Sequence, residues 1–181
     1  MPRLNVGDKM PDFEFATPYS PANRLSETVQ KCPGKTALVF LRYYGCRMCQ
    51  IDMIDYQEGY GAIAAAGGQL LVALQSDPAG LAAKIPQGSV PYTIVCDPGQ
   101  KLYKLFDIRP AASKETMKDE STAVKAARIA ELKLVHGDYE GEELQLPAAF
   151  VVDHDLTVTY AHYGRVISDT PTADELAGRV K

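Results

Sequence analysis

The sequence predicts an α/β fold in which a central, largely parallel sheet is flanked by helices. Short apolar segments rich in Val, Leu and Ile alternate along the 181 residues with segments that carry helix signals. This alternation implies right-handed crossover connections, which make neighbouring strands parallel. A hydrophobic content of 46% is ordinary for a globular protein. The length suits a single domain, residues 1–181, with its own core.

The first third of the chain predicts an arm that leads into the sheet. The arm covers residues 4–20, and within it residues 12–16 alternate polar and apolar, which is typical of a half-buried strand. We expect a short helical turn at residues 26–29 with Ser26 as its cap. A Pro-Gly turn at residues 33–34 then leads to the first central strand.

Apolar segments predict the remaining strands. Three of them, residues 36–43, 69–75 and 92–96, are expected at the centre of the sheet. The first is apolar on both faces, as in a strand covered on both sides. Residues 148–152 and 157–162 are joined by a short turn, so they predict an antiparallel hairpin.

Helices are expected at residues 46–66, 78–84, 100–107, 112–136 and from residue 172 onwards. Gly67 and Gly68 end the first, and Asp77 caps the second. Thr172 and Glu175 have capping-box spacing. The stretch 112–136 is charged, and its apolar side consists of Ala127, Ile129, Ala130, Leu132, Leu134 and Val135.

Charge and hydropathy indicate which partners and which cellular location to expect for this protein. The net charge of -4 gives no reason to expect nucleic acid or an anionic membrane as a partner. The first eight residues have no apolar core of the kind found in a signal peptide. No apolar stretch approaches the length that crosses a bilayer. We therefore expect a soluble, cytoplasmic protein.

The most specific motif is Gly45-Cys46-Arg47-Met48-Cys49, directly after the apolar segment 36–43. This position predicts a dithiol where a buried strand turns into a helix, with both sulfurs within one helical turn. Cys46 is expected at the helix N-terminus, where free N–H groups and the macrodipole favour a thiolate. A stabilised thiolate beside a second thiol is what thiol–disulfide exchange requires.

Cysteine spacing leaves two chemistries open for this pair. The chain has four cysteines, Cys32, Cys46, Cys49 and Cys96. In a reducing compartment structural disulfides are rare, so a CxxC pair is redox-active or metal-binding. A four-cysteine zinc site is not favoured because Cys32 and Cys96 form no second close pair. We expect these two to pack as small hydrophobic residues.

Four motifs occur in order along the chain: G-x-x-x-P-x-F at residues 7–13, F/Y-G-C-x-x-C at 44–49, a strand–D-P–helix segment at 91–106 and an F-I-I-D-like strand at 150–153. The order of elements around the dithiol resembles a thioredoxin fold, and these motifs are similar to those of the peroxiredoxin-like AhpC/TSA family. Residues 145–153 and 160–163 fit the same group. The resemblance implies a central mixed sheet flanked by helices, with an N-terminal arm and a helical insertion before the last two strands.

Two departures from the family pattern affect the implied chemistry. Typical members carry P-x-x-x-T-x-x-C, whereas here Cys46 stands at the Thr position and the Pro is missing. Members also place an Arg three residues before the Phe of F-I-I-D, and here that residue is Pro147. Pro147 resembles the cis-proline of thioredoxins, which implies a cis bond that aims the preceding backbone at the dithiol. The alternative is an ordinary trans proline that opens an edge strand.

The resemblance leaves the order of attack open. In the thioredoxin register Cys46 is the nucleophile, exposed at the helix start, and Cys49 resolves the mixed disulfide. In the peroxiredoxin register the roles reverse, and Cys49 attacks peroxide. The departures favour thiol–disulfide exchange, with slow peroxide reduction as a second activity.

Four further side chains are candidates for supporting roles. Arg42 interrupts a buried segment, so it either lowers a thiolate pKa or forms a structural salt bridge. Tyr44 could wall the site or pack in the core. Arg165 and His162 end the last strand beside Pro147 and could reach the active face.

The leading hypothesis is a cytoplasmic thiol–disulfide oxidoreductase reduced by a thioredoxin-like protein or a small thiol, with a disulfide or a peroxide as substrate. No organic cofactor is implied, because no Gly-rich dinucleotide motif follows a strand. One alternative is a protein that binds or delivers copper or zinc through the CxxC pair and His162. Another is a non-catalytic binding module. Such a module could form a homodimer that is joined through the helix at residues 112–136.

Overall fold

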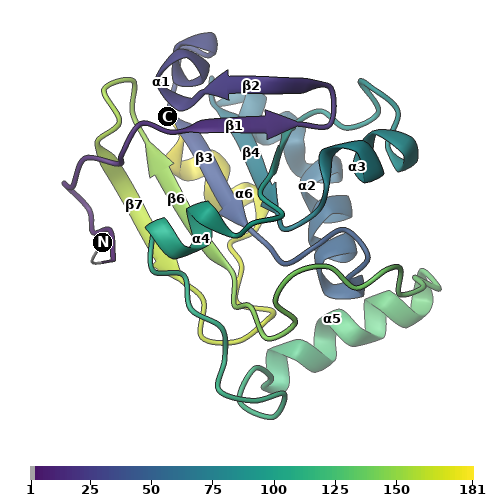
Figure 1. Ribbon diagram of the computed structural model, residues 1–181. Helices are drawn as coiled ribbons and strands as arrows, with labels where there is room; N and C mark the ends of the chain where they lie inside the picture. The colour runs from purple at the N-terminus through teal and green to yellow at the C-terminus, as the bar shows by residue number, and fades with distance from the viewer. Residues whose placement is uncertain (1–2) are drawn as a thin grey trace.

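Seven strands form one sheet in the computed structural model of the protein, which describes residues 3–181 (Figure 1). They are β1 (Glu14–Thr17), β2 (Ser20–Arg24), β3 (Thr36–Phe40), β4 (Gln69–Leu74), β5 (Thr93–Cys96), β6 (Ala148–Val152) and β7 (Val158–Tyr163). Their order across the sheet is β2-β1-β5-β4-β3-β6-β7. Strands β3, β4 and β5 are parallel, whereas β6 is antiparallel to both β3 and β7. The mixed sheet and the C-terminal hairpin confirm the predicted architecture.

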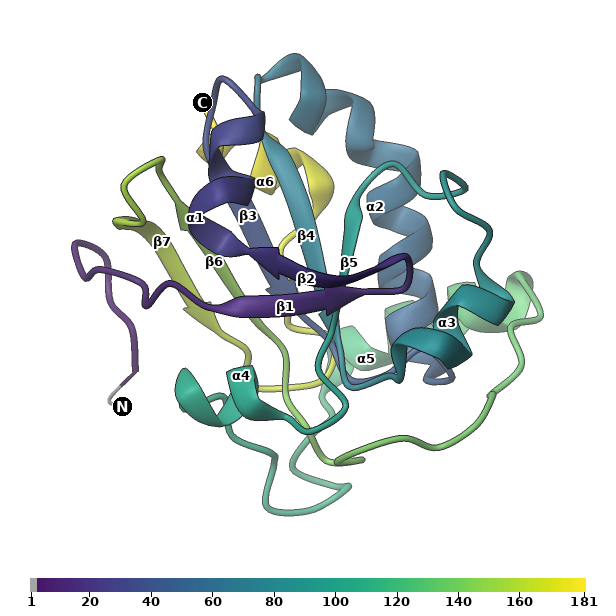
Figure 2. The same ribbon diagram turned by 45° about the horizontal axis from the view of Figure 1, so that its top comes forward.

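Helices cover both faces of this sheet (Figure 2). They are α1 (Leu25–Thr28), η1 (Val29–Lys31), α2 (Arg47–Ala65), α3 (Pro78–Lys84), α4 (Lys101–Leu105), α5 (Glu120–Glu131) and α6 (Ala173–Arg179). The side chains of α2 and α6 pack on one face, and those of α1 and α4 pack on the other. No helix in residues 3–181 combines the length and apolarity that a membrane crossing needs.

Strand β3 is central because every one of its residues is buried and it pairs on both sides. Alternate side chains enter the two halves of the core, with Val39 on the α2 face and Phe40 on the α4 face. The strand ends at Phe40, three residues before the predicted end at residue 43. The chain beyond Phe40 turns to begin α2, so that Cys46 ends this turn and Cys49 lies in the first turn of the helix.

The structure confirms the caps predicted for two helices and contradicts the one predicted for a third. Asp77 accepts a hydrogen bond from the Gly80 N–H at 2.9 Å, and Thr172 and Glu175 form the predicted capping box. The prediction for Ser26 is wrong, because this residue lies inside α1. The Asp12 carboxylate accepts hydrogen bonds from both the Ser26 N–H and its hydroxyl, at 2.9 and 2.8 Å. A carboxylate from the arm thus takes the capping role.

The predicted helix 112–136 is about half as long in the structure. Helix α5 begins after Asp119, which forms a capping box with Thr122, and it ends before Lys133, whose φ is +54°. Its apolar side is also smaller than predicted, because Val135 is 78% exposed and only Ile129 within the helix is buried. The charged sequence supplies too little apolar surface to hold a longer helix against the core.

Candidate active site

Cys46 occupies the N-cap position of α2, as the sequence predicts. Its Sγ accepts a hydrogen bond from the Cys49 N–H at 3.4 Å, and its carbonyl accepts the first helical hydrogen bond, from Gln50, at 2.9 Å. A cysteine here does what Ser or Asp does at other helix starts. The sulfur therefore lies among the free N–H groups at the positive end of the helix.

The surroundings of Cys46 favour its thiolate. They lower the pKa of Cys46 to about 5, chiefly because the Cys49 thiol donates a hydrogen bond to it. Burial works in the opposite direction, but Arg42 offsets it with its charge and with a hydrogen bond from Nη2 to Sγ at 2.9 Å. At neutral pH the anionic form of Cys46 is thus the stable one.

Cys49 lies one turn deeper and has the opposite tendency. Burial raises its pKa well above that of an ordinary thiol, and the hydrogen bond that it donates to Cys46 raises it further. Its Sγ also accepts the Arg42 backbone N–H at 3.3 Å. The pair therefore consists of one thiolate and one thiol, a state in which the second proton is held until the first sulfur has reacted.

Arg42 contacts backbone and sulfur rather than an acid. Its Nη1 donates to the Glu143 carbonyl, its Nη2 donates to Cys46, and its guanidinium lies 5.3 Å from the centre of the Tyr43 ring. Among the described residues no carboxylate forms an ion pair with Arg42, so the expected alternative of a salt bridge is not what the structure contains. Its Nε is buried without a hydrogen-bond partner.

Cys46 is fully buried, contrary to the expectation that it is exposed. A covering segment, residues 134–143, passes over the start of α2. The Gly137 N–H donates to the Gly45 carbonyl at 2.9 Å. Gly45 leaves the space for this contact, since a Cβ there would lie 2.2 Å from the Asp138 carbonyl oxygen. The glycine before the dithiol is therefore required by a segment about ninety residues further along the chain.

Three side-chain contacts fasten the covering segment on its other side. They are Ser76 Oγ to Glu140 Oε2 at 2.6 Å, Lys84 Nζ to Asp138 Oδ2 at 2.9 Å, and Glu142 N to Gln75 Oε1 at 2.6 Å. These partners follow strand β4 or belong to α3, so the segment bridges the end of the sheet. The dithiol reacts with an external molecule only if this cover shifts or Arg42 moves.

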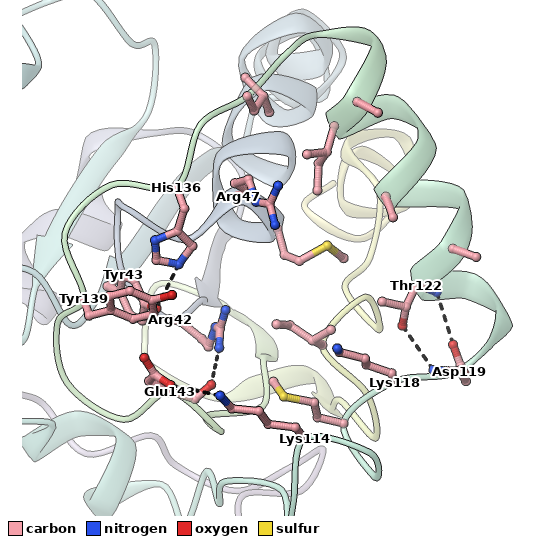
Figure 3. A pocket seen from close by; sticks show the side chains of 18 of the residues that line it. Arg42, Tyr43, Arg47, Lys114, Lys118, Asp119, Thr122, His136, Tyr139 and Glu143 are labelled. Atoms are coloured by element: carbon pink, nitrogen blue, oxygen red, sulfur yellow. Dashed lines mark hydrogen bonds and ion pairs between the residues drawn. The ribbon is translucent and has the colours of Figure 1, made fainter.

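Aromatic side chains of the covering segment stack above Tyr43. His136 Nε2 lies 3.3 Å from the Tyr43 hydroxyl, and the rings of His136 and Tyr139 stack with their centres 4.2 Å apart (Figure 3). Sequence reasoning missed His136, Tyr139 and Glu143. No local signal marks them, since their importance comes from a long-range contact with the helix start.

Two predicted supporting residues lie away from the two sulfurs. The Tyr44 N–H donates to Ser76 Oγ at 3.0 Å, and its ring lines a different cavity, bordered by Tyr92. The Arg165 side chain is 90% exposed and pairs with Asp169 at 3.5 Å. These side chains show no contact with the dithiol among the described residues.

His162 Nε2 lies 2.9 Å from Asp169 Oδ1, and no hydrogen bond joins this ring to either sulfur in the described structure. No cluster of three or more His, Cys, Asp or Glu side chains suited to a metal ion occurs in residues 3–181.

Pro147 is buried at the start of β6, but the predicted cis bond is wrong. Every peptide bond in the described part of the chain is trans. The chain runs from Gln145, which pairs with Pro110, directly into β6, so no tight turn calls for the cis form. The Pro147 carbonyl accepts a hydrogen bond from the Gly164 N–H at 2.8 Å. Pro147 is thus a trans proline that precedes a strand, as in the alternative, but β6 pairs on both sides and is not an edge strand.

Cys96 packs in the hydrophobic core as expected, at the end of β5, where burial raises its pKa to about 12. Cys32 differs from the expectation, because it is half-buried outside the core and its Sγ lies 3.2 Å from the Gly34 carbonyl oxygen.

A cavity of about 700 Å³ lies between the start of α2, α5 and the covering segment (Figure 3). Arg42 and Tyr43 line it on the side of the dithiol, and Met117 and Ile129 line it on the side of the insertion. Nothing in the sequence alone indicated this cavity.

Comparisons with known proteins agree with this fold. A model of the AhpC/TSA family matches residues 6–161. A peroxiredoxin-like protein from Aquifex aeolicus is 13% identical, with a TM-score of 0.66 over 99% of this chain and 88% of that one. Peroxidoxin BcpB from Mycobacterium tuberculosis is 15% identical, with a TM-score of 0.65 over 97% and 93%. A structure described as the thiol:disulfide interchange protein DsbE from Chlorobium tepidum is 17% identical, with a TM-score of 0.55 over 89% and 86%. No curated protein matches the sequence.

Proposed function

The chain belongs to the AhpC/TSA family, and we propose that it is a thiol–disulfide oxidoreductase in which Cys46 attacks and Cys49 resolves. Family membership supports a thiol-based redox function. The observation that carries the assignment of roles is the asymmetry of the pair. The pKa of Cys46 is lowered to about 5 beside the Arg42 guanidinium, whereas the pKa of Cys49 is raised.

The reaction needs no cofactor. The Cys46 thiolate attacks one sulfur of a disulfide, forms a mixed disulfide and releases the first thiolate of the substrate. Cys49 then loses its proton and attacks Cys46 Sγ, which releases the second thiolate and closes the Cys46–Cys49 disulfide. The substrate disulfide gains two electrons and the protein dithiol loses two. A thioredoxin-like protein or a small thiol reverses the change in a reducing compartment, for which we propose the cytoplasm.

Peroxide reduction is proposed as a slower second activity. The Cys46 thiolate would attack one peroxide oxygen, break the O–O bond and become a sulfenic acid, while the other oxygen leaves as water or as an alcohol. Cys49 would then attack the Cys46 sulfur, displace its hydroxyl as water and close the disulfide. Position 147 holds a proline, so no guanidinium from β6 assists cleavage of the O–O bond. The peroxiredoxin register, in which Cys49 attacks, is disfavoured because a raised thiol pKa leaves little thiolate at that residue.

The test is trapping by single-cysteine variants. Reduced Cys49→Ser should attack oxidised glutathione once and accumulate a mixed disulfide at Cys46, read by intact mass and peptide mapping. Cys46→Ser should form none at Cys49, and Cys96→Ser should behave as wild type. Stopped-flow reactions of the wild-type protein with oxidised glutathione and with hydrogen peroxide compare the two activities. A mixed disulfide at Cys49 in Cys46→Ser, or faster reaction with peroxide than with disulfide, would contradict the proposal.

A further inference from the structure

The cavity beside the dithiol has the size of a small-molecule site. Its volume of about 700 Å³ lies within the range of pockets that enclose drug-sized ligands. It opens where the insertion between β5 and β6 faces the start of α2 (Figure 3). It is therefore the hollow through which a small molecule can approach Arg42.

The rim of the cavity is cationic although the chain as a whole carries a charge of -4. Its basic side chains are Arg42, Arg47, Lys114, Lys118 and Lys133, and its acidic ones are Asp119 and Glu143. The Asp119 carboxylate is already used to cap α5. Among residues 3–181 no ion pair involves Arg47, Lys118 or Lys133. This excess of unpaired positive charge attracts an anion.

The floor of the same cavity is apolar. Met48, Met117, Ile129 and Ile167 line it, and the last three of these are buried. Methionine side chains adapt to irregular ligand shapes. An apolar floor under a cationic rim matches a ligand that has an apolar body and anionic substituents.

Arg42 connects the cavity to the reacting sulfur. The guanidinium lines the cavity, donates to Cys46 Sγ at 2.9 Å and has a buried Nε with no hydrogen-bond partner. A ligand seated in the cavity therefore meets the side chain that holds the thiolate. Displacement of Arg42 towards an anion would bring the ligand to Cys46 without unfolding the covering segment.

We propose that this cavity is the substrate site of the dithiol and that it takes small organic disulfides with an apolar body and anionic groups. This inference rests on the proposed function, and the chemistry is the exchange already described. Cys46 attacks the sulfur nearer Arg42, one anionic thiol leaves, and Cys49 releases the other. Lys118 and Lys133 hold the anionic groups and touch neither sulfur.

Binding is tested first with an unreactive analogue. Oxydibenzoate carries two carboxylates on aromatic rings and has an ether oxygen in place of the disulfide, and its neutral diamide is the control ligand. Calorimetry on the full chain should detect the dicarboxylate and not the diamide. The double variant Lys118→Gln/Lys133→Gln should bind it about tenfold more weakly. Lys101→Gln/Lys104→Gln, which removes the same charge from exposed positions of α4, should bind as wild type.

Reaction is tested with two chromogenic disulfides. Dithiobis(nitrobenzoate) is anionic and dithiodipyridine is neutral at pH 7, and each rate is divided by the rate of the same reagent with a free small thiol. The wild-type protein should prefer the anionic reagent, and the cavity double variant should lose that preference while the control double variant keeps it.

The outcomes separate the two proposals. Binding of the dicarboxylate without any disulfide exchange would overturn the proposed function and keep the anion site. Exchange with no charge preference and no binding of the dicarboxylate at about 5 mM would overturn the site and keep the function. Equal losses in the cavity and control variants would also overturn the site.

Discussion

Replacing Arg42 by Gln should raise the pKa of the Cys46 thiol. The change removes the hydrogen bond from Nη2 to Sγ at 2.9 Å and the positive charge beside it. A hydrogen bond to a charged group contributes about 1.5–3 kcal/mol. One pKa unit corresponds to about 1.4 kcal/mol, so the loss raises the pKa by about one to two units. The thiol would then titrate between about 6 and 7 instead of about 5.

Ultraviolet absorbance of the thiolate measures this directly, even for a buried sulfur. Each protein is titrated together with its Cys46→Ser counterpart, and the difference isolates Cys46. At pH 6 the thiolate fraction should fall from about nine-tenths in the wild type to between about one-tenth and one-half in the variant. Disulfide exchange measured at that pH should slow by less than the thiolate fraction falls, because the thiolate is the attacking species but a thiolate of higher pKa is intrinsically more nucleophilic.

Arg47→Gln is the matched control. It removes the same charge from the residue next to Cys46, but no hydrogen bond joins the Arg47 side chain to either sulfur in the described structure. Arg47→Gln should change the pKa of Cys46 by about half a unit or less, because solvent screens the Arg47 charge. Equal shifts in the two variants, or a Cys46 pKa that stays near 5 in Arg42→Gln, would refute the role given to the hydrogen bond. Urea unfolding of both variants checks that the fold is kept.

Other changes test the packing around the dithiol. Gly45→Ala should cost about 1–3 kcal/mol in urea unfolding and speed alkylation of Cys46, since a Cβ there would lie 2.2 Å from a backbone oxygen of the covering segment. Gly61→Ala in α2, where nothing lies within 4 Å, should instead stabilise by about 0.5–1 kcal/mol, and a loss in both variants would argue against the close contact. Asp52→Ala should lower the free energy of unfolding by about 3 kcal/mol, because it leaves the largely buried Lys125 ammonium without its ion-pair partner. The double variant Asp52→Leu/Lys125→Met should restore most of this stability, and no recovery would contradict this account. The folded-state pKa of Cys46 lies below its ordinary value of 9.0, so its contribution to stability is complete above pH 9 and is lost as pH falls through about 5. The free energies of unfolding of the reduced wild-type protein and of Cys46→Ser should be compared across that pH range. The difference between them should shrink as pH falls, and a constant difference would disprove this linkage.

The sequence by itself determined the features that depend on neighbouring residues. Asp77 and the Thr172–Glu175 pair were found because a cap bonds within its own first turn. Strand β3 was found because the run from Ala37 to Phe40 is apolar on both faces. The Cys46–Cys49 spacing placed one sulfur at the helix start and the other a turn deeper, for the same local reason. Family motifs then added the mixed sheet and the hairpin.

Only the tertiary structure decided what surrounds those two sulfurs. The covering segment buries Cys46 through contacts that span about ninety residues, and Arg42 reaches the Glu143 carbonyl across 101 positions. Asp12, not Ser26, caps α1 for a similar reason, since a carboxylate from another segment accepts the hydrogen bonds at this helix start. Such contacts depend on how the helices and strands pack against one another. They also depend on which buried polar groups still need a hydrogen-bond partner after packing. Neither can be predicted from the residues next to each site in the sequence. The identity of the reactive pair is therefore local, whereas its exposure, charge environment and access route are properties of the whole fold.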